Sequence, residues 1–112
     1  MEKRIVEITQ TALADMEEIY DYIADVLLAP ENAMGQYNRI ADAILTLESN
    51  PESCPFFEAE PEQSWRMRRM VIDNYLVCYI VDQDKVTVTD VLYGASNVYV
   101  RLKARHMSEP DT

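Results

Sequence analysis

Three arginines in the second half of the chain carry the clearest chemical signal in the sequence. The run from Trp65 to Ile72 reads WRMRRMVI, in which arginines alternate with apolar residues. Successive side chains of a β-strand point to opposite faces, so Arg66 and Arg68 share one face and Arg69 points to the other. The first two therefore form the better pair for a phosphate group. The alternative is that all three are ordinary exposed strand arginines.

The other reactive side chains do not indicate cofactor or metal chemistry. Only two glycines are present, which excludes a glycine-rich phosphate loop. The single histidine, His106, is expected to be a solvated tail residue and cannot build a zinc site with two distant cysteines. Cys78 is expected in the core, and Cys54 has no basic neighbour in the sequence to activate its thiol. We therefore expect neither a cofactor nor a metal ion.

The charge is divided unevenly along the chain. The net charge is −10, to which residues 1–64 contribute 14 acids against three bases. Residues 65–105 instead hold seven bases against four acids. The total argues against a nucleic-acid binder, but the division indicates two surfaces with different partners. The basic half is suited to phosphates, and the acidic half to solvent or a basic partner.

The length and composition indicate one globular domain. The chain has 112 residues, of which 48% are apolar and 27% charged, and these values exclude a disordered chain. We assign residues 1–105 to the domain and residues 106–112 to a polar C-terminal tail. No apolar run approaches the ~20 residues that span a bilayer, and the first residues lack the apolar segment of a signal peptide. A cytoplasmic protein without a membrane partner is expected.

Two amphipathic helices are predicted after a short N-terminal strand at residues 3–9. Thr9 or Thr11 is expected to cap the first helix, because a threonine oxygen accepts from free backbone N–H groups in the first turn. Apolar residues then recur at three-four spacing, and acids occupy the opposite side. Pro30 leads into a second stripe, which ends at Asn50-Pro51. The two stripes predict an αα-hairpin.

The hydrophobic period changes from 3.6 to 2 after the second helix. Residues 51–64 read as an extended connector, which we expect Phe56 and Phe57 to pin to the core. Three strands follow, and a short helix from Asn97 to Arg105 ends the domain. The predicted strands are residues 66–72, 75–81 and 86–92.

The middle strand is expected at the centre of the sheet because it is almost continuously apolar. Its even spacing places Tyr75 and Tyr79 on one face, with Leu76 and Cys78 on the other. The order of elements predicts an α+β fold: an N-terminal strand, an αα-hairpin, a three-stranded antiparallel meander with helices on one face, and a short C-terminal helix.

Three sequence motifs occur in an order that points to a known family. They are Ile-x-x-Tyr-Ile from Ile19 to Ile23, Leu-x-x-Asn-Pro from Leu47 to Pro51, and Arg-Arg-Met-Val-x-x-Asn-Tyr-x-x-x-Tyr from Arg68 to Tyr79. With the hairpin before them, they resemble the RelE/ParE superfamily of toxins from type II toxin–antitoxin modules, which includes the plasmid stabilisation type. The resemblance extends from the first strand to about Leu102.

The resemblance implies a toxin with a basic sheet face that a cognate antitoxin wraps and inactivates. RelE-like members cut mRNA in the ribosome, and ParE-like members inhibit DNA gyrase. RNA cleavage requires proton transfer and cations at the phosphate. In this chain the resemblance assigns the catalytic cations to Arg66 and Arg68 and proton transfer to Tyr93. The phosphate- or partner-binding residues would be Arg69, Arg101, Lys103 and Arg105.

One position departs from the family pattern. An arginine commonly follows the last strand closely in this superfamily, where the present chain has Ala95 and Ser96. One such charge at a developing oxyanion is worth about 3 kcal/mol. The long hairpin also favours the ParE type. We therefore predict growth inhibition by a gyrase-directed route, and the alternatives are a RelE-like ribosome-dependent mRNA endoribonuclease or a non-catalytic interaction domain on the same fold.

Overall fold

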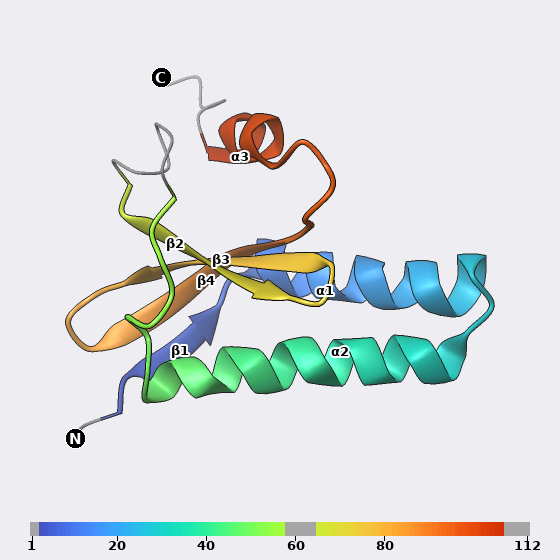
Figure 1. Cartoon of the computed structure of the whole chain (residues 1–112), viewed down its shortest axis with the longest axis horizontal. Coiled ribbons are helices and arrows are strands. Elements are labelled where there is room, and N and C mark those ends of the chain that lie inside the picture. The colour runs from blue at the N-terminus through green and yellow to red at the C-terminus, as the bar shows by residue number, and fades with distance from the viewer. Residues whose placement is uncertain (1–2, 58–64, 107–112) are drawn as a thin grey trace.

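Four strands form one mixed sheet in the order β1-β4-β3-β2 (Figure 1). The computed structural model describes residues 3–57 and 65–106. The strands are β1 (Ile5–Ile8), β2 (Met67–Ile72), β3 (Tyr75–Val81) and β4 (Lys85–Tyr93). The last three form the predicted antiparallel meander, and β1 adds to β4 in parallel. The chain can return to a parallel neighbour because the αα-hairpin and the meander lie between these two strands.

The αα-hairpin covers one face of the sheet and extends past its end (Figure 1). It consists of α1 (Gln10–Asp21), a π-helical turn η1 (Tyr22–Val26), α2 (Pro30–Leu45) and a 3₁₀ turn η2 (Thr46–Glu48). The Thr9 hydroxyl accepts a hydrogen bond of 3.1 Å from the N–H of Ala12, so Thr9, one of the two predicted candidates, is the cap. Pro30 occupies the first turn of α2, as predicted.

The C-terminal helix α3 (Val98–His106) lies on the opposite face of the sheet from the hairpin (Figure 1). The prediction of helices on one face only was therefore wrong. The reason is visible in β3, where Val77 and Tyr79 pack toward the hairpin while Leu76 and Cys78 pack toward α3. A central strand that is apolar on both faces needs a cover on each.

The predicted faces of β3 are confirmed. Tyr75 and Tyr79 both join the core under the hairpin, with Met16, Ile40 and Ile44. Leu76 and Cys78 join a second core, which α3 closes with Val98 and Leu102. The sheet thus separates two apolar layers, and each face of β3 has a partner.

The connector after α2 pairs with the outer edge of β2. Phe57 is buried in the core under α3, as predicted, and its N–H donates to the carbonyl of Met67 over 2.9 Å. Phe56 is only half-buried and forms an isolated bridge with Arg68. The rest of the predicted connector, 58–64, lies outside the described residues. Among the described helices, none is long and apolar enough to span a bilayer.

Candidate functional surfaces

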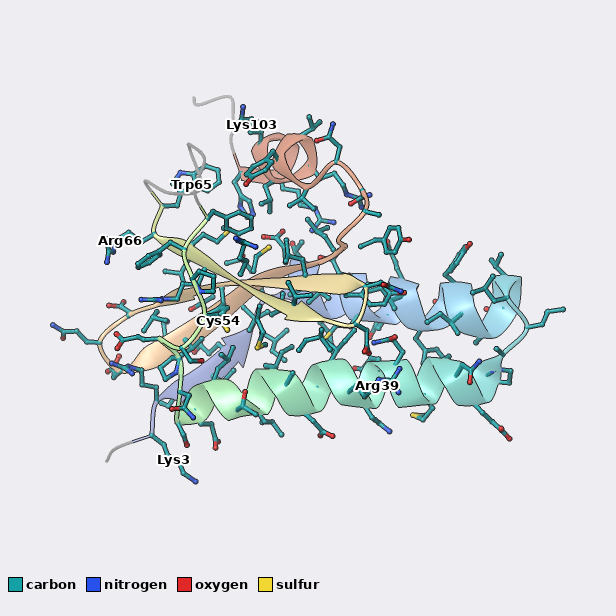
Figure 2. The ribbon with its side chains drawn as sticks, in the orientation of Figure 1. Lys3, Arg39, Cys54, Trp65, Arg66 and Lys103 are labelled. Atoms are coloured by element: carbon teal, nitrogen blue, oxygen red, sulfur yellow. The ribbon has the colours of Figure 1, made fainter. Side chains whose placement is uncertain are left out.

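Arg66 and Arg68 both lie against the ring of Phe56 at the start of β2. Their guanidinium carbons are 4.8 and 4.0 Å from the ring centroid, within the range of a cation–π contact. Both arginines thus face the same ring, which agrees with the prediction that they share one face. Arg66 itself precedes the strand, has a φ of 59° and extends into solvent at the end of the sheet (Figure 2).

Arg68 is bound to the connector as well as to Phe56. Its Nη1 donates to the carbonyl oxygen of Cys54 over 2.6 Å and makes a longer contact of 3.4 Å to that of Glu52. A charged donor on a carbonyl makes a stronger hydrogen bond than a neutral one. Arg68 therefore fastens the connector to the sheet, whereas Arg66 remains exposed.

A second side chain of the sheet holds the same connector. The Tyr79 hydroxyl donates to the carbonyl oxygen of Pro51 over 2.8 Å. The side chain is fully buried, and burial raises the pKa of this hydroxyl well above its usual range. Tyr79 is thus a neutral hydrogen-bond donor that ties the end of the hairpin segment to the central strand.

Tyr93 lies far from the arginine pair. It ends β4 opposite Tyr75, with ring centroids 5.9 Å apart, whereas Arg68 pairs with Tyr79. Four residues of strand separate Tyr75 from Tyr79, or about 13 Å along β3, and two strand spacings add roughly 10 Å across the sheet. Burial, and then the neighbouring Tyr93, raises the pKa of Tyr75. Of the three predicted catalytic side chains, Arg66 and Arg68 therefore lie at one end of the sheet and Tyr93 at the other.

Tyr93 and Arg101 instead share a hollow. The hollow measures about 540 Å³ and lies between α1, the β2–β3 turn and α3, with Tyr22, Leu27 and Tyr75 also on its wall. Half of the Tyr93 surface is exposed there. Tyr93 thus shares this hollow with an arginine of the C-terminal helix, which the chain order alone did not predict.

Arg105 is bound by two carboxylates. Its Nη1 and Nη2 donate to the two oxygens of Asp15 over 2.8 Å each, and Nη1 also donates to Asp90 over 2.9 Å. These hydrogen bonds, first to Asp15 and then to Asp90, raise the pKa of the guanidinium above its ordinary value. Arg105 therefore joins α3 to α1 and β4. This arrangement leaves it poorly placed for a phosphate.

His106 extends α3 one residue beyond the predicted domain boundary. Its Nε2 lies 2.9 Å from the second oxygen of Asp90, and its ring meets the Trp65 ring edge-on at 5.6 Å. The expectation of a tail residue was therefore wrong, because His106 belongs to α3 and contacts the fully buried Asp90, which requires partners; the residue is nevertheless exposed, as expected. Asp90 interrupts an alternating apolar strand in the sequence, and that interruption was the signal for this cluster.

The remaining predicted cations are exposed or half-exposed. Arg69 lies on the α3 side of β2 beside a second hollow of about 390 Å³, which Tyr93 and Tyr99 also line. Lys103 projects from α3 into solvent (Figure 2). Within the described part of the chain, Arg66, Arg69, Arg101 and Lys103 have no carboxylate within 4.0 Å. These four cations are available to an anionic partner.

Sequence reasoning also missed a polar cluster that joins the β2–β3 turn to α2. The Oδ2 of Asp73 accepts from Gln36 Nε2 over 2.9 Å and from Arg39 Nε over 2.8 Å. The hydrogen bonds from Arg39 and then Gln36 lower the pKa of this carboxyl. Asp73 has a φ of 55°, a conformation that aspartate tolerates better than most residues.

Comparisons with known proteins agree with this architecture. Residues 6–98 match the family model described as the ParE toxin of the type II toxin–antitoxin system, parDE. A solved structure described as the chromosomal ParDE TA system from P. aeruginosa has a similar fold, with a TM-score of 0.68 and 19% identity. The similarity covers 81% of this chain and 96% of that one. No curated protein matches the chain.

Proposed function

Because the chain belongs to the ParE toxin family of type II toxin–antitoxin systems, we propose that it arrests growth by acting on DNA gyrase. The observation that carries this proposal is the separation of Tyr93 from Arg66 and Arg68. RNA cleavage needs a proton-transfer group and cations around one phosphate. Arg68 is bound to the connector and Tyr93 lies at the other end of the sheet, so the predicted set of Arg66, Arg68 and Tyr93 does not meet around one phosphate.

Two further observations support a route without RNA cleavage. Arg105 is engaged by Asp15 and Asp90, and the position of the arginine common in the superfamily is occupied by Ala95 and Ser96. The net charge of −10 also repels RNA at long range, so any attraction must come from a small local patch. A toxin that acts by binding an enzyme needs neither a free catalytic arginine nor a long-range attraction to RNA.

A cognate ParD antitoxin is the expected inhibitor. We expect an antitoxin segment that is disordered when free to fold over the exposed cations of the sheet and α3 and the apolar surface of the hairpin. Such an interface should bury well over about 1,000 Å² in total. Coexpression with the product of the adjacent gene should yield a copurifying complex, and its absence would count against this partner.

The purified protein is tested against both candidate targets, DNA gyrase and ribosome-bound mRNA. We expect the wild-type protein to inhibit supercoiling of relaxed plasmid by gyrase and to leave mRNA intact on translating ribosomes. Tyr93→Phe should retain growth arrest, because no proton transfer is involved. Ribosome-dependent cleavage of mRNA that Tyr93→Phe abolishes would instead establish the RelE-like alternative.

A further inference from the structure

The hollow of about 390 Å³ beside Arg69 lies on the face of the sheet that α3 covers. Its wall is formed by β2, the β2–β3 turn, the end of β4, α3 and the connector. We call it the aromatic hollow and define it by Phe57, Arg69, Asn74, Tyr75, Tyr93 and Tyr99. Its volume is in the range of small-molecule sites, about 300–1,000 Å³. The proposed action on gyrase gives this hollow no role.

Aromatic rings are concentrated in the aromatic hollow. Four of the ten aromatic residues of the chain line it. Tyr75 and Tyr93 form one pair of rings and Phe57 and Tyr99 form another, and the ring centroids are 5.9 Å apart in each pair. Tyr93 and Tyr99 are 50% and 41% exposed, so part of this ring surface is open to a ligand. Such a surface is suited to a planar ring, which binds aromatic side chains by stacking.

Arg69 adds a positive charge to the same wall. It is half-buried, and within residues 3–57 and 65–106 no carboxylate lies within 4.0 Å of its guanidinium. Asp73 also lines the hollow, but its Oδ2 accepts from Arg39 over 2.8 Å, so a cation already compensates this carboxylate. A planar guanidinium has the geometry to bind phosphate oxygens in pairs. The hollow thus combines an uncompensated cation with stacking surface.

We propose that the aromatic hollow binds a free nucleoside monophosphate, with the base on the tyrosine rings and the phosphate on Arg69. An acidic side chain would use only the cation, and an apolar side chain would use only the rings. A nucleotide carries both a planar ring and a phosphate, so it uses the whole wall. This binding site is a property of the toxin itself and does not depend on its target.

The charge of the whole protein favours a single nucleotide over a nucleic-acid strand. The net charge of −10 repels a polyanion at long range. One phosphate monoester carries only about two negative charges. Arg69 is also the only cation among the residues that line this hollow. A strand would need further cations along its backbone.

Two variants of the hollow, each with a matched control, test the assignment. Arg69→Gln removes the cation, and its control Lys103→Gln removes the same charge from an exposed position of α3 outside the hollow. Tyr99→Leu removes a ring, and its control Tyr22→Leu removes a comparably exposed ring outside the hollow. Thermal unfolding verifies that all four variants fold. Isothermal titration calorimetry then measures the binding of adenosine and guanosine monophosphates, adenosine, inorganic phosphate and a single-stranded oligonucleotide.

We expect the wild-type protein to bind one of the two monophosphates at least about tenfold more tightly than adenosine or inorganic phosphate, because only a nucleotide uses both the rings and the cation. Arg69→Gln and Tyr99→Leu should each weaken this binding by about tenfold. The two control variants should match the wild type. The oligonucleotide should bind no more tightly than the mononucleotide.

Four outcomes contradict the inference. They are no binding of either monophosphate up to about 1 mM, unchanged affinity in both variants of the hollow, equal affinity for nucleotide and inorganic phosphate, and tighter binding of the oligonucleotide. Equal affinity for inorganic phosphate would reduce the site to an anion contact of Arg69, and tighter oligonucleotide binding would assign it to a nucleic-acid strand. Inhibition of gyrase is measured separately, so either proposal can fail while the other stands.

Discussion

Arg105 and Asp15 form a bidentate ion pair across 90 positions of the sequence, with both N···O distances at 2.8 Å. The pair joins the C-terminal helix to the first helix beside the part of β4 that lies beyond its pairing with β1. The same guanidinium reaches Asp90, which is fully buried in β4. Asp15 also accepts from the N–H of Val91 over 2.9 Å. One arginine thus holds two buried carboxylates and three elements together.

Removal of Arg105 should destabilise the fold strongly. Arg105→Ala leaves Asp15 and Asp90 buried without their cation. We expect the free energy of unfolding to fall by about 3 kcal/mol, the low end of the range for a broken buried ion pair. The low end applies because a quarter of the Arg105 side chain is exposed. Urea unfolding measures the difference. Arg101→Ala is the control and should cost less than about 0.5 kcal/mol; equal midpoints for the two variants would show that the cluster does not stabilise the fold.

Tyr79→Phe should loosen the connector. The substitution leaves the Pro51 carbonyl without its 2.8 Å donor in a buried site, at a cost of about 1–3 kcal/mol. Hydrogen exchange should report faster exchange at residues 51–57 than in the wild type. Tyr99→Phe, at an exposed tyrosine of α3, should leave both stability and exchange unchanged. An unaltered exchange pattern in Tyr79→Phe would contradict the role assigned to this hydroxyl.

Arg66 and Arg68 should differ in their effect on stability although they contact the same ring. Arg68→Ala loses a charged hydrogen bond to the Cys54 carbonyl, which is worth about 1.5–3 kcal/mol. Arg66→Ala loses only an exposed cation–π contact, worth about 0.5–1 kcal/mol. Chemical denaturation of the two variants side by side tests this order. A reversed order would mean that Arg66, and not Arg68, anchors the connector.

The Asp73 cluster should contribute a pH-dependent part of the stability. The pKa of Asp73 is lower in the folded protein than its ordinary value, so its stabilisation is present above about pH 4 and is lost as the pH falls through the folded pKa. The difference in unfolding free energy between wild type and Asp73→Asn should thus shrink from about pH 6 to about pH 2.5. Asparagine tolerates the φ of 55°, so the backbone is preserved.

Other titrating carboxyls are common to the wild type and to Asp73→Asn, and their effects cancel in the difference. Arg39→Gln offers a second measurement, because it removes the largest cause of the lowered pKa. A difference in unfolding free energy that stays constant over this pH range would show that the charge of Asp73 does not stabilise the fold.

The sequence by itself determined the elements and the faces of the central strand. Periods of 3.6 and 2 are local properties, so they placed the hairpin, the meander and the terminal helix to within a few residues. The cap at Thr9 and the start of α2 at Pro30 also follow from groups within one turn of each other. The motifs from Ile19 to Tyr79 identified the family for the same reason, since their spacing is read directly along the chain.

Only the tertiary structure decided which distant side chains meet. It placed α3 on the second face of the sheet, engaged Arg105 with Asp15 and Asp90, and bound Arg68 to the connector. These outcomes depend on packing between elements and on the need of buried charges for partners, neither of which follows from local spacing. In the same sheet, β3 lies between β2 and β4, and Tyr93 ends β4 at the opposite end from Arg66 and Arg68.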